Sequence, residues 1–267
     1  MSQVNPLEEF NDFWKKIFSE VDPWTLLGQQ YGQIPEKERS NFLQEFLPQP
    51  FYGYLHRNMK DDLLLLLINP GQVRPNELFN LLPGGSKEEQ IQIWNEKIQK
   101  RHQTWNEAEY HANEKWLLQN NDNWREVRRK QALNIYGDFA FLHTIEFFPF
   151  HSKDWKLTGL KKQSWIYDLQ PTKLAIHAIK QLAEESGVKH IVGIGKPWVN
   201  ILNHYKDLFV LVETHGISGE KRFSHRLYKF VSRLGGIPIV IYISGAGGIN
   251  LPSDGEAVEI LRRLSQN

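Results

Sequence analysis

The stretch DDLLLLLINPG, residues 61–71, indicates the fold class of this chain. It contains six consecutive apolar residues, 63–68, which are followed at once by the turn-forming pair Pro70-Gly71. A short apolar run that ends in a turn is typical of a strand buried on both faces, as in a parallel sheet. Such a sheet needs helices on both faces, so further buried strands and amphipathic helices are expected along the chain.

Three more segments are also mainly apolar runs that end at or near Pro or Gly. Strands are predicted at residues 139–148, 190–194 and 237–243, which are followed by Pro149, Gly195 and a Gly-rich run, respectively. Helices are predicted at residues 171–186, from Pro197 through Ile201, at 226–234 and after Asp254, and a short strand at 209–212. This alternation predicts an α/β protein, a three-layer α/β/α sandwich around a four-stranded, mainly parallel sheet.

The first 55 residues are predicted to be N-terminal helices. Phe10, Trp14 and Phe18 are four residues apart and share one helical face, and Phe42 and Phe46 suggest a second short helix. Pro23, Gly28 and Gly32 interrupt the helical pattern between them. No repeat or flexible linker is evident, so residues 1–267 are expected to form a single domain.

Residues 86–133 are predicted to be a helical insertion in that domain. Trp94, Trp105 and Trp116 recur every eleven residues, about three helical turns, which would align them on one continuous helix. Two helices with a turn near residues 102–106 fit the pattern equally well.

Composition excludes several classes of function. Lys and Arg number 32 and Asp and Glu 31, so a protein that coats polyanions is not expected, although a local basic groove is compatible with this balance. The chain has no cysteine, which excludes disulfides, thiolate zinc sites, iron–sulfur clusters and cysteine nucleophiles. Residues 1–10 lack an apolar signal region, and no apolar run is long enough to span a bilayer. A cytoplasmic monomer without membrane contact is expected.

Four segments that follow the predicted strands carry residues suited to ligand binding: 69–71, 146–152, 195–196 and 244–248. In open parallel sheets, ligands bind beyond the carboxyl ends of the strands. The chain has no G-x-G-x-x-G, P-loop, G-x-S-x-G or H-E-x-x-H motif, so no nucleotide cofactor or metal is expected.

Taken in order, these segments resemble the motifs of the uracil-DNA glycosylase superfamily. Residues 67–71, LINPG, keep the Asn-Pro-Gly of the first motif, G-x-N-P-G, and lack its first Gly. Residues 191–198, IVGIGKPW, match the third strand, a Gly and the helix that follows. Residues 141–149, FLHTIEFFP, have the shape of the second strand without its base-reading Asn, and residues 242–245 keep only Ser and Gly of the last motif.

The resemblance implies a DNA glycosylase, which cleaves the N-glycosidic bond of a base flipped out of DNA. The sugar passes through an oxocarbenium-like state, so the site must place a water and stabilise the departing base. Asn69 would orient the water, and the second catalytic candidate is Glu146. That carboxyl is costly inside the protein unless it is paired or protonated, so it is either functional or exposed at the sheet end. No cofactor is implied, and the lack of cysteine excludes the iron–sulfur branches.

The remaining candidates line the base pocket or contact DNA. Pro70, Gly71 and Phe79 would line the base pocket. Phe79 would stack on the base unless it is a core residue. His143 or Thr144 would take the base-reading position, unless His143 is a satisfied core residue, and Tyr242 would replace the missing His. His151 and Ser152 would contact a phosphate or form a plain surface turn. Ser244 and Gly245 would grip phosphates, Ile249 or Leu251 would be the wedge, and Lys196 would contact the DNA backbone, as would Lys221, Arg222 and Arg226.

The missing Asn and His suit a base other than plain uracil, such as a bulky modified pyrimidine. Some bacterial members of the superfamily act on phage DNA that carries such bases, so a role in phage defence is the natural extension. Two alternatives remain: a catalytically idle member that binds DNA or protein, and a small-molecule nucleoside hydrolase. A long Lys and Arg groove would favour DNA, and a closed pocket would favour the small molecule.

Overall fold

The computed structural model describes residues 5–20, 22–68, 71, 73, 75–103, 123–152, 164–218, 224–244, 250–253 and 255–266. The chain forms two compact units. The first comprises Met1–Tyr54, Ile68–Tyr110 and Glu146–His177, and the second comprises Leu55–Leu67, His111–Ile145 and Ala178–Asn267. Each unit is therefore built from three separate stretches of sequence.

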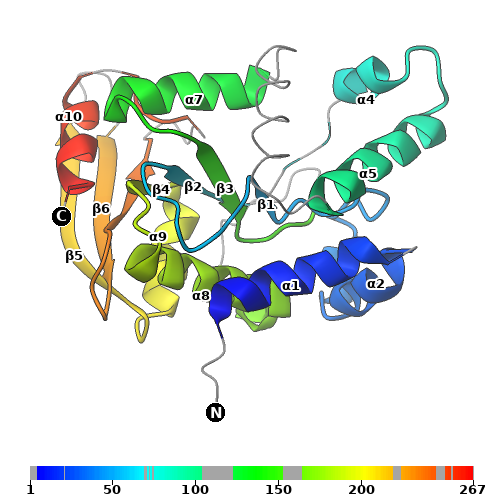
Figure 1. The fold of residues 1–267 in the computed structure, drawn as a ribbon, viewed down its shortest axis with the longest axis horizontal. Helices are drawn as coiled ribbons and strands as arrows, with labels where there is room; N and C mark the ends of the chain where they lie inside the picture. Colours follow the sequence, from blue (N-terminus) through cyan, green and yellow to red (C-terminus); the bar gives the residue numbers. More distant parts are fainter. Residues whose placement is uncertain are drawn as a thin grey trace. The chain divides into compact units, whose positions relative to one another are not determined.

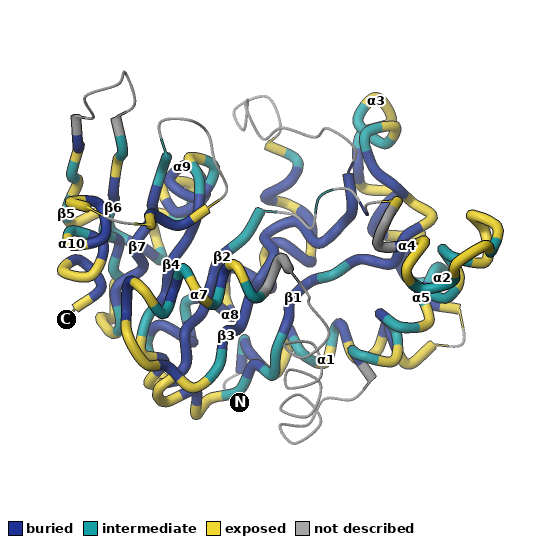
Figure 2. Tube along the Cα trace, turned by 90° about the horizontal axis from the view of Figure 1, so that it is seen from above, coloured by how far each residue is buried: buried dark blue, intermediate teal, exposed yellow. Residues whose placement is uncertain are grey.

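The four predicted strands form the centre of the sheet. They are β2 (Leu63–Leu67), β3 (Leu142–Glu146), β4 (His190–Ile194) and β7 (Ile239–Ile243), in the spatial order β3-β2-β4-β7. β2 pairs with β4 and β4 with β7, both in parallel. Hydrogen bonds from Leu63 N to Phe141 O and from Phe148 N to Ile68 O continue the parallel pattern to β3. Nearly all their residues are buried, as double-sided packing requires (Figure 2).

The sheet has seven strands, and not the four that we predicted. β6 (Ser224–Ser232) pairs antiparallel with β7, and β5 (Phe209–Ser218) pairs antiparallel with β6. The predicted helix at 226–234 is therefore wrong, and the predicted strand at 209–212 is longer than expected. β1 (Phe51–Tyr52), which belongs to the first unit, is the seventh strand.

Helices cover both faces of the sheet in the second unit (Figure 1). α7 (Asn123–Tyr136) and α10 (Gly255–Leu264) share one apolar cluster with Leu63, Val192 and Val240. On the other face α9 (Lys196–His204) packs so closely that a Cβ at Gly193 would lie 3.3 Å from Trp198. The second half of α8 (Gln170–Glu185) joins that face, since Ile237 N donates to Ala183 O. The predicted three-layer α/β/α arrangement is confirmed.

The first unit is mainly helical. It contains α1 (Pro6–Ser19), α2 (Trp24–Gly32), α3 (Glu36–Arg39), α4 (Pro75–Leu81), α5 (Lys87–Gln103), the 3-10 helix η2 (Ser164–Asp168) and the start of α8. Asn5 caps α1, and Phe10, Trp14 and Phe18 are buried along it as predicted. The predicted helix around Phe42 and Phe46 is wrong, because these buried side chains lie on an irregular segment.

The predicted helical insertion is only partly described. α5 ends at Gln103 and α7 begins at Asn123, so Trp105 and Trp116 lie outside the described residues. Trp94 lies on α5, where it packs against the apolar cluster of Leu43, Phe46, Val73 and Leu78. This cluster belongs to the first unit and includes residues on both sides of the Asn-Pro-Gly segment.

Candidate active site

The strand order places a topological switch point at the carboxyl ends of β2 and β4. From β2 the chain proceeds to β3 on one side, and β4 then pairs with β2 on its other side. In open α/β sheets, ligands bind in the crevice at such a reversal. The segments that follow β2 and β4 begin at Ile68 and Gly195, so both are motif segments of the sequence analysis.

The segments that follow β2 and β3 are joined by hydrogen bonds in the first unit. Phe148 N donates to Ile68 O at 2.8 Å, and Ser152 N donates to Gly71 O at 3.2 Å. Two motif segments that are nearly 80 residues apart in sequence are therefore neighbours in space. Asn69 and Pro70 themselves lie outside the described residues.

Glu146 is a buried carboxyl group at the end of β3. Only 7% of the residue is exposed, and its Oε2 has no hydrogen-bond partner within the described part of the chain. Burial raises the pKa of this carboxyl well above its ordinary value. Burial therefore favours the protonated, neutral form of this carboxyl. The predicted alternative, a carboxyl exposed at the sheet end, is wrong.

His151 and Ser152 are both buried, which corrects the prediction of a phosphate contact or a surface turn. His151 Nδ1 lies 3.0 Å from Gly71 O, and its Nε2 lies 3.2 Å from Gln49 Nε2. Both ring nitrogens are therefore engaged inside the first unit. Burial lowers the pKa of His151 to about 4, since the charged imidazolium is disfavoured away from water.

His143 and Thr144, the predicted base-reading candidates, are both buried on β3. His143 Nε2 lies 2.9 Å from Asp62 Oδ2, and Asp62 immediately precedes β2. Asp62 Oδ1 also accepts from Phe141 N at 3.2 Å. This pair thus lies toward the amino ends of β2 and β3, and His143 is a buried core residue that pairs with Asp62 through Nε2. The base-reading role of Thr144 stays a prediction.

In the second unit, Tyr242 and His225 form a pair near the carboxyl end of β7. The Tyr242 hydroxyl and His225 Nδ1 share a hydrogen bond of 2.8 Å, and their rings are stacked. Burial raises the pKa of the Tyr242 phenol, and a hydrogen bond with Ser244 acts in the opposite direction. Gly195 N donates to Tyr242 O at 2.8 Å, which joins the segment after β4 to the end of β7.

His225 was missed by the sequence analysis. It lies on β6, which was predicted as a helix, so the pairing of β6 with β7 was not predicted. The local signal for a strand was the group Tyr228, Phe230 and Val231, since aromatic and β-branched residues are enriched in strands.

The other predicted DNA contacts have mixed outcomes. Leu251 is buried in the apolar cluster of the second unit, so its predicted role as a wedge is wrong. Lys196 is exposed at the first position of α9, and Ser244 is half-buried directly after β7. Gly245, Ile249, Lys221 and Arg222 lie outside the described residues, whereas Arg226 is exposed on β6. Phe79 is 54% exposed on α4, which excludes the core alternative and leaves base stacking as a prediction.

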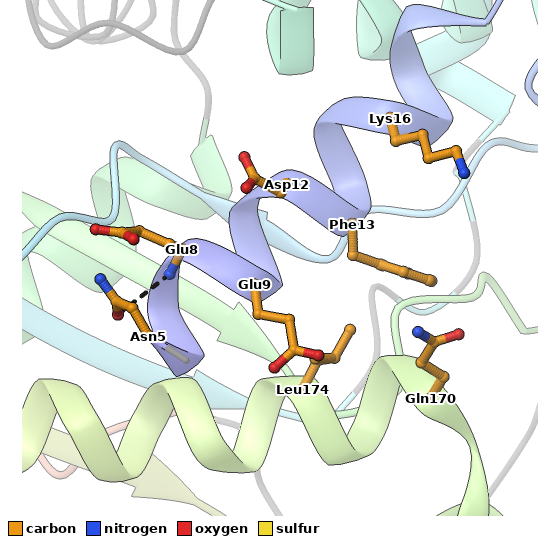
Figure 3. Close-up of a pocket in the computed structure, with 8 residues that line it drawn as sticks. All are labelled: Asn5, Glu8, Glu9, Asp12, Phe13, Lys16, Gln170 and Leu174. Carbon is orange, nitrogen blue, oxygen red and sulfur yellow. Dashed lines mark hydrogen bonds between the residues drawn. The ribbon is translucent and has the colours of Figure 1, made fainter. Parts of the chain in front are cut away.

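A pocket of about 490 Å³ lies between α1 and the start of α8 in the first unit (Figure 3). Its lining residues are Asn5, Glu8, Glu9, Asp12, Phe13, Lys16, Gln170 and Leu174, none of which is a predicted site residue. Three carboxylates against one ammonium group make it unsuited to a DNA phosphate.

Neither a metal-binding cluster nor a membrane-spanning helix is found within the described ranges. No group of three or more His, Asp or Glu side chains there is arranged to hold a metal ion. No helix in the same part of the chain is long and apolar enough to cross a membrane.

Comparisons of the chain with protein-family models, with curated proteins and with solved structures found no match. Any function must therefore be argued from the residues themselves.

Proposed function

We propose that this chain is a DNA glycosylase that hydrolyses the N-glycosidic bond of a flipped-out, modified pyrimidine base. One observation supports the proposal above the others. Within the first unit, the segment that carries the buried carboxyl of Glu146 is hydrogen-bonded to the segment that carries Asn69-Pro70-Gly71. The motif resemblance assigns the water-orienting role to Asn69 on one segment, and the buried acid Glu146 lies on the other.

The proposed chemistry needs little from the protein. The bond between the sugar C1′ and the base nitrogen breaks, and its electron pair leaves with the base. Asn69 orients a water whose oxygen then bonds to C1′ and whose proton is released. An oxocarbenium ion accepts a weak nucleophile, so the amide oxygen of an Asn suffices as a partner for that water.

Glu146 is proposed to act on the departing base. Burial raises the pKa of its carboxyl and so favours the protonated form, which can donate a hydrogen bond. A neutral donor aimed at a base that gains negative charge stabilises the transition state more than the ground state.

The proposal extends to the target and the setting. The missing base-reading Asn, and the engagement of His143 with Asp62, leave a pocket without the amide that reads plain uracil. A monomeric, cytoplasmic enzyme that removes hypermodified bases from phage DNA would use such a pocket in defence.

The first experiment offers DNA oligonucleotides with a panel of normal and modified bases and scores abasic sites. Uracil-containing DNA and hypermodified phage DNA are compared under the same conditions. Abasic sites in phage DNA support the full proposal, whereas efficient removal of uracil alone would leave an ordinary repair enzyme. DNA binding without abasic sites on any substrate would indicate the idle alternative, and cleavage of free nucleosides alone would indicate the small-molecule hydrolase.

The catalytic assignment is tested by Asn69→Ala. Its cleavage rate should fall by about two to four orders of magnitude while DNA binding is kept, as for other key polar groups. Asn80→Ala, which changes an exposed Asn on α4, is the matched control and should keep full activity. A chelator should leave the rate unchanged. Full activity of Asn69→Ala, or loss of activity on chelation, would contradict the mechanism.

A further inference from the structure

Gly71, the last residue of the Asn-Pro-Gly segment, has a carbonyl that accepts two hydrogen bonds from the segment after β3. The donors are His151 Nδ1 at 3.0 Å and Ser152 N at 3.2 Å. The φ angle of Gly71 is 71°, a left-handed conformation that favours glycine. The direction of this carbonyl is therefore fixed by contacts from another part of the first unit.

The imidazole of His151 is held in one tautomer. Because Gly71 O only accepts, Nδ1 must carry the proton, and Nε2 is left with a lone pair. Gln49 Nε2 lies 3.2 Å from that nitrogen and donates to it. The ring also contacts Phe46 and Trp94, with centroids 5.7 and 6.3 Å away, so it has little freedom to turn.

The segment that carries Gln49 is anchored by backbone hydrogen bonds and by Asn95 of α5. Gln49 N donates to Pro149 O and Leu43 N donates to His151 O, each at 2.9 Å. Asn95, on α5, accepts from Leu47 N and donates to Glu45 O, each at 2.8 Å. Side-chain hydrogen bonds therefore run from Gln49 through His151 to Gly71, and α5 holds the backbone just before Gln49.

We propose that His151 is a positioning residue that fixes the backbone of Gly71, two residues after Asn69, with Gln49 as the group that sets the tautomer of His151. The catalytic consequence rests on the proposed function, whereas the positioning itself does not. A reacting group must be held closely, and misplacement by about 1 Å costs on the order of 100-fold in rate. Outer groups that orient a catalytic residue act in the same way around metal ligands.

Two substitutions of His151 separate its hydrogen bond from its bulk. The amide nitrogen of Asn occupies nearly the position of imidazole Nδ1, so His151→Asn can keep the bond to Gly71 O. His151→Leu fills the site and removes both hydrogen bonds. Gln49→Leu removes only the donor to Nε2, and Gln29→Leu, on an exposed Gln of α2, is the matched control.

The direct measurement is hydrogen exchange, followed by mass spectrometry, of the peptide that covers residues 69–74 and of the peptide that contains Ser152. Exchange should rise at least about tenfold in His151→Leu and about three- to tenfold in Gln49→Leu, from the ordinary strength of one or two hydrogen bonds. It should stay near the unaltered level in His151→Asn and Gln29→Leu. Urea unfolding of each variant establishes that it is folded.

Base removal by the same proteins gives the second readout. In His151→Leu, kcat should fall on the order of 100-fold while KM for DNA changes little, and His151→Asn should recover most of the loss. If His151→Leu does not fold, Gln49→Leu alone decides. Unchanged exchange in these variants overturns the positioning role. Raised exchange together with no base removal by the unaltered protein would keep the positioning role and reject the proposed function.

Discussion

His143 and His151 are eight residues apart and both lie inside the protein, yet their partners differ in kind. His143, in the second unit, donates to a carboxylate of Asp62 that also accepts from Phe141 N. His151, in the first unit, lies between the neutral carbonyl of Gly71 and the neutral amide of Gln49. The first histidine belongs to a buried pair with a carboxylate, and the second to a neutral hydrogen-bonded chain.

This difference shows that a buried histidine takes its role from its partners and from its position along the strand. Asp62 and His143 lie near the amino ends of their strands, where parallel sheets contribute stability and not binding. His151 follows β3 beyond its carboxyl end and touches the motif segment after β2. The following predictions test whether stability and function separate along these lines.

The largest effect is expected at the carboxylate pair. Asp62→Ala should lower the free energy of unfolding by about 3–5 kcal/mol, because it removes the buried carboxyl that pairs with His143 and accepts from Phe141 N. Urea unfolding followed by tryptophan fluorescence measures this. Asp61→Asn, at the exposed neighbouring residue, is the control and should have little effect. A loss of unfolding free energy under about 1 kcal/mol for Asp62→Ala would mean that the pair stabilises the fold no more than an exposed salt bridge does.

The burial of His151 among neutral groups should make the protein less stable at acidic pH. The pKa of His151 is about 4 in the folded protein and about 6.5 when unfolded, so the unfolded chain binds the proton first as the pH falls. Stability is therefore full above pH 6.5 and is lost toward pH 4, by about 3 kcal/mol at roughly 1.4 kcal/mol per pKa unit. His102, whose pKa burial also lowers, adds to the same loss.

The contribution of His151 is isolated by measuring urea unfolding at several values between pH 7 and pH 4.5. His151→Asn removes the titrating group, so its stability should depend less on pH than that of the unaltered protein. Parallel curves for the two proteins would show that His151 is not held neutral by burial.

Glu146 should give an effect of the opposite sign. Its pKa is raised in the folded state, so its contribution to stability is full below the unfolded pKa of 4.5 and is lost as the pH rises. Glu146→Gln cannot ionise and should therefore be more stable than the unaltered protein at pH 8. The gain should vanish below pH 4.5.

The same substitution tests the proposed donor role. The Gln amide also donates, so Glu146→Gln should keep base removal within about tenfold, whereas Glu146→Leu should lose on the order of 100-fold or more. The unaltered protein should lose activity as the pH rises through the pKa of Glu146, and the Gln variant should lack that limb. Equal activity of the Leu variant would remove Glu146 from the mechanism.

The smallest effect is expected for the neutral Tyr242 and His225 pair. Tyr242→Phe should lower the free energy of unfolding by about 1 kcal/mol, the net value of one hydrogen bond between neutral groups. Tyr228→Phe, on β6, is the control. A loss as large as that of Asp62→Ala would mean that the second unit does not distinguish charged from neutral pairs.

The sequence alone was sufficient for the elements with strong local signals. Leu63–Leu67 and Ile239–Ile243 are apolar runs next to Gly or Pro, and α1, α8, α9 and α10 have apolar residues at helical spacing. Local pattern was not sufficient for Ser224–Ser232, where Leu227 and Phe230 are three residues apart, as on a helix. Pairing with β5 and β7 on both sides made this segment a strand.

Most site assignments needed contacts between distant residues. The motif segments at the carboxyl ends of β2 and β3 were identified from sequence, and their hydrogen bonds in the first unit agree with that placement. The roles of single side chains were less predictable. Leu251 and His151 follow turn signals and were expected at the surface, but α7 and the segment around Gln49, respectively, pack over them.

The sequence by itself determined the four central strands, the helices between them and the positions of the motif segments, because these depend on residues close together in the chain. Only the tertiary structure decided that His143 pairs with Asp62, that His151 supports Gly71 and that Glu146 is buried without a described partner for its Oε2. Charge state and role depend on desolvation and on hydrogen-bond partners. Residues some 80 to 100 positions away supply those partners, and no local pattern encodes them.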